Sequence, residues 1–131
     1  MRKLKKKVLF IVEKSEDGYW AYTPGLPIFT YGETFNELRE NASEAYNLYL
    51  EDSGFEIDER NILLEIDLKQ FFQYYRVINA KFLAKRIGMN ESLLSQYVQG
   101  RKKPSHRQTR RILLGINEIG RELSDLHLFV K

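Results

Sequence analysis

The spacing of apolar residues changes along the chain, and the change predicts strands first and helices later. Short apolar or aromatic runs, which are typical of β-strands, occupy residues 8–13, 19–22, 28–31 and 62–66. The first run is almost continuously apolar, so it predicts a central strand buried on both faces. Asp17 and Gly18 separate the first two runs, and this dipeptide favours a tight hairpin.

A helix is predicted between the third and fourth strands. Thr34 suits its N-cap, and Glu37 follows at capping-box spacing. The predicted inner face comprises Phe35, Leu38, Ala42, Ala45, Tyr46 and Tyr49. The predicted outer face carries an acidic stripe of Glu37, Glu40 and Glu44. The order β-β-β-α-β predicts an α+β domain over residues 1–66.

Residues 80–105 carry the signals of two short helices joined by a tight turn. The first helix repeats apolar residues at helical spacing, at Phe82, Leu83 and Ile87. Gly88 follows at a position that favours the left-handed conformation, and Asn90 suits the N-cap of the second helix. The predicted inner face of the second helix comprises Leu94 and Val98. Gly100 ends it, and a basic loop follows.

The outward positions of the second helix are small or polar, as in helices that contact base edges in a major groove. The predicted base-reading residues are Glu91, Ser92, Ser95 and Gln96. The predicted phosphate contacts are Lys81, Arg101, Lys102, Lys103, Arg107 and Arg110. This stretch resembles the helix-turn-helix domains of the lambda-repressor type, which implies binding to double-stranded operator DNA. The alternative is an ordinary amphipathic helix pair with a solvated loop.

Two flanking helices complete a predicted all-α domain over residues 67–131. Asp67 can cap the first, which is expected to reach about Val77 and to pack on the helix-turn-helix. Ser105 caps the last, and cations crowd its first turns against the helix dipole, so we expect DNA phosphate to offset them. A heptad-like stripe follows at Ile112, Ile116, Ile119, Leu123 and Leu126. It predicts a core contact, a homodimer or higher even oligomer, or both.

Composition and charge restrict the chemistry. The 131 residues include no cysteine and only two histidines, His106 and His127, so no disulfide or thiolate metal site is possible and no metal or cofactor is expected. Residues 1–66 hold 8 Lys and Arg against 13 Asp and Glu, whereas residues 67–131 hold 13 against 5. A basic half favours a polyanionic partner, and an acidic half favours a basic one. No transmembrane segment or signal peptide is predicted, and a cytoplasmic location is expected.

The acidic half carries a second resemblance. The run from Asp17 through Tyr19, Trp20, Tyr22 and Thr23 to Pro27, followed by Tyr31-Gly32-Glu33-Thr34 and a helix, resembles the HicB family of antitoxins. That family has a partial RNase H-like domain, often followed by a DNA-binding domain. The resemblance covers about residues 8–66. It implies a type II toxin–antitoxin system in which this half blocks a HicA-type toxin, a small basic mRNA-cleaving protein.

The predicted toxin contacts combine aromatic contact area with acidic charge. They are Tyr19, Trp20, Tyr22, Tyr31, Glu37, Glu40 and Glu44. Aromatic residues in strands also commonly form packed cross-strand pairs, and an acidic stripe can simply be solvated, so each residue has a purely structural alternative.

Two alternative functions remain open. The chain could be a stand-alone repressor whose N-terminal domain senses a ligand or only dimerises. A metal-dependent nuclease would need carboxylates that converge on two metal ions, and the candidates are Glu13, Asp17, Glu33, Glu65 and Asp67. Asp17 is better explained by the turn and Glu33 by the helix start. We therefore predict an antitoxin and autorepressor without enzymatic activity.

Overall fold

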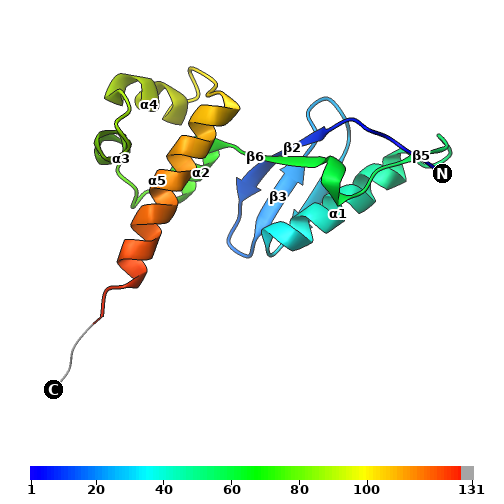
Figure 1. The fold of residues 1–131 in the computed structure, drawn as a ribbon, viewed down its shortest axis with the longest axis horizontal. Coiled ribbons are helices and arrows are strands. Elements are labelled where there is room, and N and C mark those ends of the chain that lie inside the picture. Colours follow the sequence, from blue (N-terminus) through cyan, green and yellow to red (C-terminus); the bar gives the residue numbers. More distant parts are fainter. Residues whose placement is uncertain (128–131) are drawn as a thin grey trace. The chain divides into compact units, whose positions relative to one another are not determined.

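The computed structural model describes residues 1–127. By its internal contacts the chain divides into two compact units, Met1–Tyr74 and Tyr75–Lys131. The first unit holds all the described strands, and the second is helical (Figure 1). The mixed α+β composition with N-terminal strands agrees with the sequence prediction. The division falls after Tyr74, whereas the predicted boundary followed Ile66.

A four-stranded sheet forms the first unit. Its strands are β2 (Val8–Lys14), β3 (Tyr19–Tyr22), β4 (Phe29–Gly32) and β6 (Ile62–Ile66), in the spatial order β4-β3-β2-β6. All four predicted strands and the hairpin are confirmed. In the hairpin, the Ser15 N–H donates to the Gly18 carbonyl at 2.9 Å. β6 runs parallel to β2, so the chain must cross over the sheet between β4 and β6.

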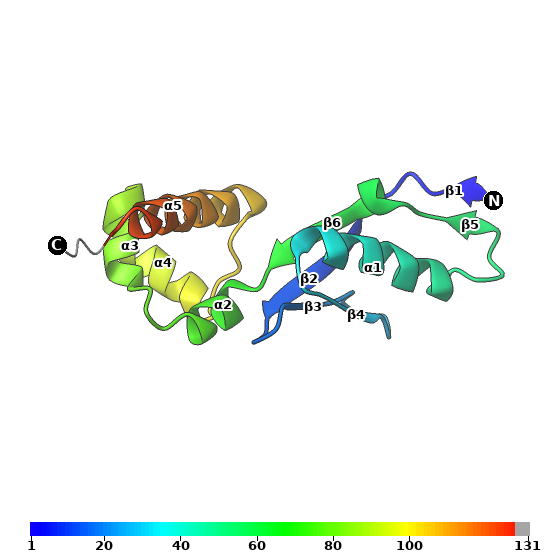
Figure 2. The same ribbon diagram turned by 90° about the horizontal axis from the view of Figure 1, so that it is seen from below.

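Helix α1 (Phe35–Tyr49) makes most of that crossover and covers one face of the sheet (Figure 2). Thr34 caps it as predicted, because its Oγ1 accepts from the Glu37 N–H at 3.1 Å. The core beneath it is formed mainly by Phe10, Val12, Ala21, Leu38, Ala42 and Tyr46. The predicted inner face was too wide, since Phe35 and Tyr49 are largely exposed. Both lie at the ends of the helix, and Phe35 packs with only part of its ring against Tyr19 of β3.

Three small elements were not predicted. Strand β1 (Arg2–Lys3) pairs in parallel with β5 (Phe55–Glu56), and a 3-10 turn, η1 (Glu59–Asn61), precedes β6. The buried Asn61 amide donates to the carbonyls of Leu4 and Lys6 at 2.9 and 2.8 Å. This side chain therefore ties the basic N-terminal segment to residues more than fifty positions away. Such long-range pairing leaves no local pattern in the sequence.

Helix α2 (Leu68–Tyr74) belongs to the first unit. Asp67 caps it, because its Oδ1 accepts from the Gln70 N–H at 3.2 Å. The Gln70 amide then pairs with the backbone of Lys14, accepting from its N–H at 2.8 Å and donating to its carbonyl at 2.7 Å. This pairing fastens the helix to the end of β2. The helix ends at Tyr74, three residues before the predicted end.

Three helices form the second unit: α3 (Ala80–Ile87), α4 (Glu91–Val98) and α5 (His106–Ser124). Its buried apolar residues include Leu83, Ala84, Met89, Leu94, Tyr97 and Ile112. Phe82 was predicted on the inner face of α3 but is 64% exposed. Leu83 is buried as predicted, together with Ala84, and Phe82 lies just outside that buried side. Across residues 1–127, no helix is long and apolar enough to cross a membrane.

Candidate nucleic-acid interface

The turn between α3 and α4 fixes both helices through side-chain caps. Asn79 Oδ1 accepts from the Phe82 N–H at 3.2 Å, and Asn90 Oδ1 accepts from the Leu93 N–H at 3.1 Å. Gly88 has φ 69°, which glycine adopts without a Cβ clash, and its N–H bonds the carbonyl end of α3. Met89 is buried beneath the turn. The predicted Asn90 cap and left-handed Gly88 are therefore present, whereas the Asn79 cap was not predicted.

Helix α5 holds this turn in place. Arg111 Nη2 donates to the carbonyls of Ile87 and Gly88 at 2.7 and 2.9 Å. The guanidinium lies at the carbonyl end of α3, where the helix dipole favours a cation. Gly115 allows α5 to approach α3 closely, because an added Cβ would lie 2.4 Å from Ile87 Cγ2. Arg111, one of the cations in the first turns of α5, is thus bound by carbonyl groups within the unit. The sequence did not predict this role.

The predicted base-reading residues lie on the accessible side of α4. Glu91 and Ser92 are exposed, and Ser95 and Gln96 are partly exposed. Ser95 Oγ accepts from Gln99 Nε2 at 3.2 Å. Glu91 Oε1 lies 3.8 Å from Lys85 Nζ, a distance at which an exposed ion pair is weak. These groups therefore keep hydrogen-bonding capacity toward an outside partner.

The opposite side of α4 is apolar. Leu94 is fully buried, Tyr97 is nearly so, and Val98 is only partly buried. Sequence reasoning missed Tyr97, which is three positions after Leu94 and so lies on the same side of the helix. The polar and apolar sides of α4 are therefore distinct, and the polar side is not needed for the core.

The basic loop after α4 is held by the backbone. The Arg101 and Lys102 N–H groups both donate to the Gln96 carbonyl, at 2.9 and 3.3 Å. Their side chains, and that of Lys103, are exposed. Ser105 then caps α5, because its Oγ accepts from the Gln108 N–H at 3.1 Å. The loop cations are thus fixed at the C-terminal end of α4.

All six predicted phosphate contacts are exposed. In the part of the chain that the structure describes, none of them forms a salt bridge, whereas Arg86 pairs with Glu122 and Lys85 with Glu91. Residues 75–131 hold 12 Lys and Arg against 4 Asp and Glu. The second unit therefore combines exposed cations with a polar helix face, an arrangement that can bind phosphates and contact base edges.

The apolar stripe of α5 is buried at one end only. Ile112 is fully buried and Ile116 and Ile119 are partly buried, whereas Leu123 is 60% and Leu126 74% exposed. The first half of the stripe completes the core of the unit. The second half leaves apolar side chains exposed in the single chain. The predicted apolar tail, residues 126–130, lies mostly outside the described residues.

The predicted toxin contacts do not form one surface. Strand register places Trp20, Tyr22 and Tyr31 on the sheet face opposite α1. Tyr19 lies on the other face, where its ring stacks on Phe35 with centroids 4.4 Å apart. The acidic residues of the predicted set are exposed on α1. They are Glu37, Glu40 and Glu44. The predicted set is therefore divided between the sheet face opposite α1 and α1 itself.

Tyr22 and Tyr31 lie on the sheet face opposite α1, near several carboxylates. Partial burial raises the pKa of Tyr22, and the nearby carboxylates of Glu13 and Asp67 raise it further. Partial burial also raises the pKa of Tyr31, together with Asp17, Glu33 and Glu37. Both hydroxyl groups therefore stay protonated well into the alkaline range and can donate hydrogen bonds.

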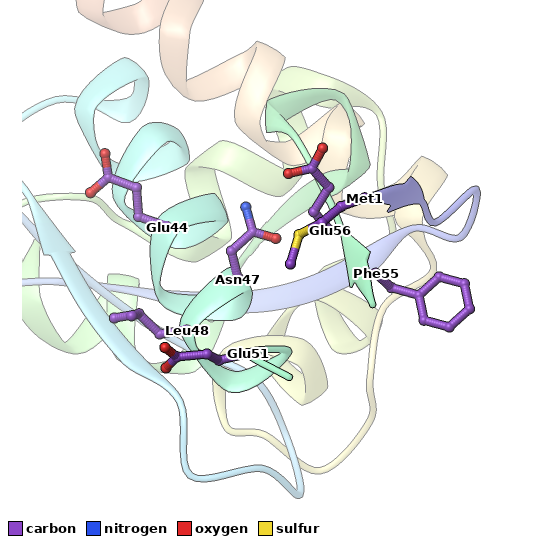
Figure 3. Close-up of a pocket in the computed structure, with 7 residues that line it drawn as sticks. All are labelled: Met1, Glu44, Asn47, Leu48, Glu51, Phe55 and Glu56. Carbon is purple, nitrogen blue, oxygen red and sulfur yellow. The ribbon is translucent and has the colours of Figure 1, made fainter. Parts of the chain in front are cut away.

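The carboxylates considered for metal chemistry are dispersed. Within residues 1–127, no group of three or more His, Asp or Glu side chains is placed to hold a metal ion. A pocket of about 470 Å³ lies beside the C-terminal half of α1 (Figure 3). It is lined by Met1, Glu44, Asn47, Leu48, Glu51, Phe55 and Glu56. The Asn47 amide is already paired with the backbone of Ile57, which leaves mainly carboxylates and apolar groups for a ligand.

No protein-family model, curated protein or solved structure matches this chain.

Proposed function

We propose that the chain is an antitoxin that also represses its own operon. In this proposal the second unit binds operator DNA through a helix-turn-helix made by α3 and α4. The first unit neutralises a small basic mRNA-cleaving toxin of the HicA type. The observation that carries the DNA-binding role is the polar, accessible side of α4, which is flanked by exposed cations without acidic partners among the described residues.

The residues of the second unit have distinct roles in this proposal. Gln96 can pair with adenine, and Glu91 can accept from the amino group of cytosine. Ser92 and Ser95 supply smaller hydrogen-bonding groups beside them. The six cations contact phosphates on either side and set the position of α4 on the duplex. A homodimer through the exposed end of α5 would present two copies of α4 to two half-sites.

Titration of duplex DNA tests this role. A preferred sequence is first selected by the full-length chain from a random duplex library. Lys102→Ala should then weaken binding to preferred and random DNA alike and lower the salt dependence by about one phosphate contact. Gln96→Ala should change the preferred sequence, because a base contact typically carries about 1–3 kcal/mol of discrimination.

Lys69→Ala is the matched control, since Lys69 is an exposed lysine of the first unit. It should leave DNA binding unchanged. Flat titrations of the unaltered chain at low salt would remove the DNA-binding role. Equal losses for Gln96→Ala on preferred and random DNA would remove the base-reading role of Gln96.

The antitoxin role depends on the resemblance of residues 8–66 to HicB antitoxins and on charge. The first unit, residues 1–74, holds 14 Asp and Glu against 9 Lys and Arg, and five of those cations lie in residues 1–7, so the rest of this unit attracts basic surfaces. The second candidate is a stand-alone repressor whose first unit senses a ligand, and the pocket beside α1 favours it. Co-expression with a HicA-type toxin separates the two, because only an antitoxin forms a complex and restores growth.

A further inference from the structure

The face of the sheet opposite α1 is aromatic along one side and acidic along the other. Strand register aligns its side chains in two rows across the sheet. The first row is Phe29, Tyr22, Ile11 and Glu65, and the second row is Tyr31, Trp20 and Glu13. Directly opposed residues have Cβ atoms about 4.5–5.5 Å apart. Trp20 directly opposes Glu13, whereas Ile11 separates Tyr22 from Glu65 by two strand spacings, about 10 Å, which a long side chain lying across the row can span.

These aromatic groups are accessible. Trp20 is 48% and Phe29 69% exposed. Trp20 lies against Tyr31 with ring centroids 5.2 Å apart, and Tyr22 stacks on Phe29 at 5.7 Å. Cross-strand pairing alone accounts for the ring contacts, but it does not require large aromatic groups to remain open to solvent. Exposed apolar patches of this kind commonly mark contact surfaces.

The carboxylates of this face have no cationic partner. Within residues 1–127, neither Glu13 nor Glu65 forms an ion pair. Both are partly buried, so a pair formed there would be screened less than a fully exposed one. A nucleic acid is disfavoured because the carboxylates repel phosphates. A second copy of the same face is disfavoured because its carboxylates would be brought against these.

We propose that this face binds a basic protein through arginine side chains that stack on Trp20 and Tyr22 and pair with Glu13 and Glu65. The guanidinium group is planar, binds aromatic faces and forms two-point hydrogen bonds with carboxylates. An ammonium group has no planar surface to stack. The inference rests on the proposed antitoxin role and specifies which surface of the first unit the toxin contacts. It excludes the acidic stripe of α1 from that contact.

Trp20 is the single tryptophan, so its fluorescence reports directly on this face. The full-length chain is titrated with an octa-arginine peptide and separately with an octa-lysine peptide at low salt. Octa-arginine should change the Trp20 emission in a saturable way and bind about tenfold more tightly than octa-lysine. Equal affinities, or binding without a change in emission, would overturn the proposal.

Charge reversal locates the site. The double variant Glu13→Lys with Glu65→Lys should weaken octa-arginine binding about tenfold or more. Its control is Glu40→Lys with Glu44→Lys, which makes the same charge change on the exposed side of α1. The control should retain binding to within about threefold, because its carboxylates lie on the other side of the sheet. Equal losses in the two variants would overturn the assignment, and the comparison of the two peptides tests it even if one variant does not fold.

Other occupants give different results. A change in Trp20 emission on adding a single-stranded RNA oligonucleotide would identify a nucleic-acid site and overturn the proposal. A change caused by Arg101→Ala, Lys102→Ala and Lys103→Ala together, without peptide, would identify the chain's own basic unit as the occupant. Neither change is expected.

Growth rescue separates this inference from the proposed function. Rescue from a HicA-type toxin should be lost in the Glu13/Glu65 variant and retained in the Glu40/Glu44 variant. If both variants rescue growth, the antitoxin role stands and the assigned surface is wrong. If the unaltered chain gives no rescue but octa-arginine binds at Trp20, the antitoxin role is wrong and the arginine-binding surface stands.

Discussion

The two units differ in the origin of their surfaces. In the second unit, the base-facing residues and the loop cations come from one continuous stretch, residues 91–103. In the first unit, Glu13 and Glu65 reach the same face from strands separated by the whole of α1. The second unit is basic and the first is acidic, so they suit partners of opposite charge. In the proposed function, each unit therefore carries its own binding surface, with a chemistry independent of the other.

Each unit also has buried apolar residues of its own. Phe10 and Leu38 are fully buried in the first unit, and Leu94 and Ile112 are fully buried in the second. If these cores are energetically separate, damage to one should leave the other folded. Mutations within one core test that separation directly.

Truncation of a core side chain should affect one unit only. Phe10→Ala should destabilise the first unit by about 3–5 kcal/mol, and Leu94→Ala should destabilise the second by about 2–5 kcal/mol, because each leaves a cavity. Urea unfolding followed by Trp20 emission reports on the first unit, and DNA binding reports on the second. Leu94→Ala should abolish DNA binding and leave the Trp20 midpoint unchanged. A matching shift of that midpoint would show that the two cores unfold together.

Two adjacent arginines should separate stability from DNA binding within the second unit. Arg111→Met removes both hydrogen bonds to the end of α3 and should lower the free energy of unfolding by about 1–2 kcal/mol. Arg110→Met makes the same charge change one position earlier, where the side chain is exposed and is a proposed phosphate contact. It should weaken DNA binding with little change in stability. Thermal unfolding and duplex titration measure the two effects, and equal losses of stability would contradict the assigned roles.

The smallest effect concerns acid stability of the first unit. Hydrogen bonds from the Arg60 side chain and N–H hold the pKa of Asp58 well below its usual value. Because the folded-state pKa is lowered, the stabilisation is fully present above the unfolded pKa of about 4 and is lost as the pH falls below it. Asp58→Asn should therefore reduce the melting temperature slightly near neutral pH and flatten its fall in acid. An unchanged acid profile would show that the exposed pair contributes nothing measurable.

Much of the fold could be predicted because its signals are local. The predicted caps at Thr34, Asn90 and Ser105 each bond to an N–H three residues later, so a short window of sequence contains both partners. The strand runs and the hairpin are local in the same sense. The burial predictions were wrong where a difference of one position along a helix decides whether a side chain points into the core. Phe82 has the spacing of an inward residue but lies just outside the buried side of α3.

The candidate sites were predicted unequally for the same reason. The residues of α4 and its loop were located from their neighbours in the chain. The toxin contacts were grouped only by composition, and the structure separates Tyr19 from Trp20 because successive strand residues point to opposite faces. The roles of Arg111 and Gln70 depend on carbonyl and amide groups that are distant in sequence. No local sequence pattern indicates these roles.

Neighbouring residues and composition were enough to predict the main helices and strands, most helix caps and the opposite charges of the two halves. Long-range packing instead sets which aromatic groups share a face, which half of the α5 stripe is buried and that α2 belongs to the sheet unit. Strand pairing between distant segments sets the first of these, and a shift of one residue would reverse it. The other two depend on which surfaces are already covered by the rest of each unit, which no short stretch of sequence specifies.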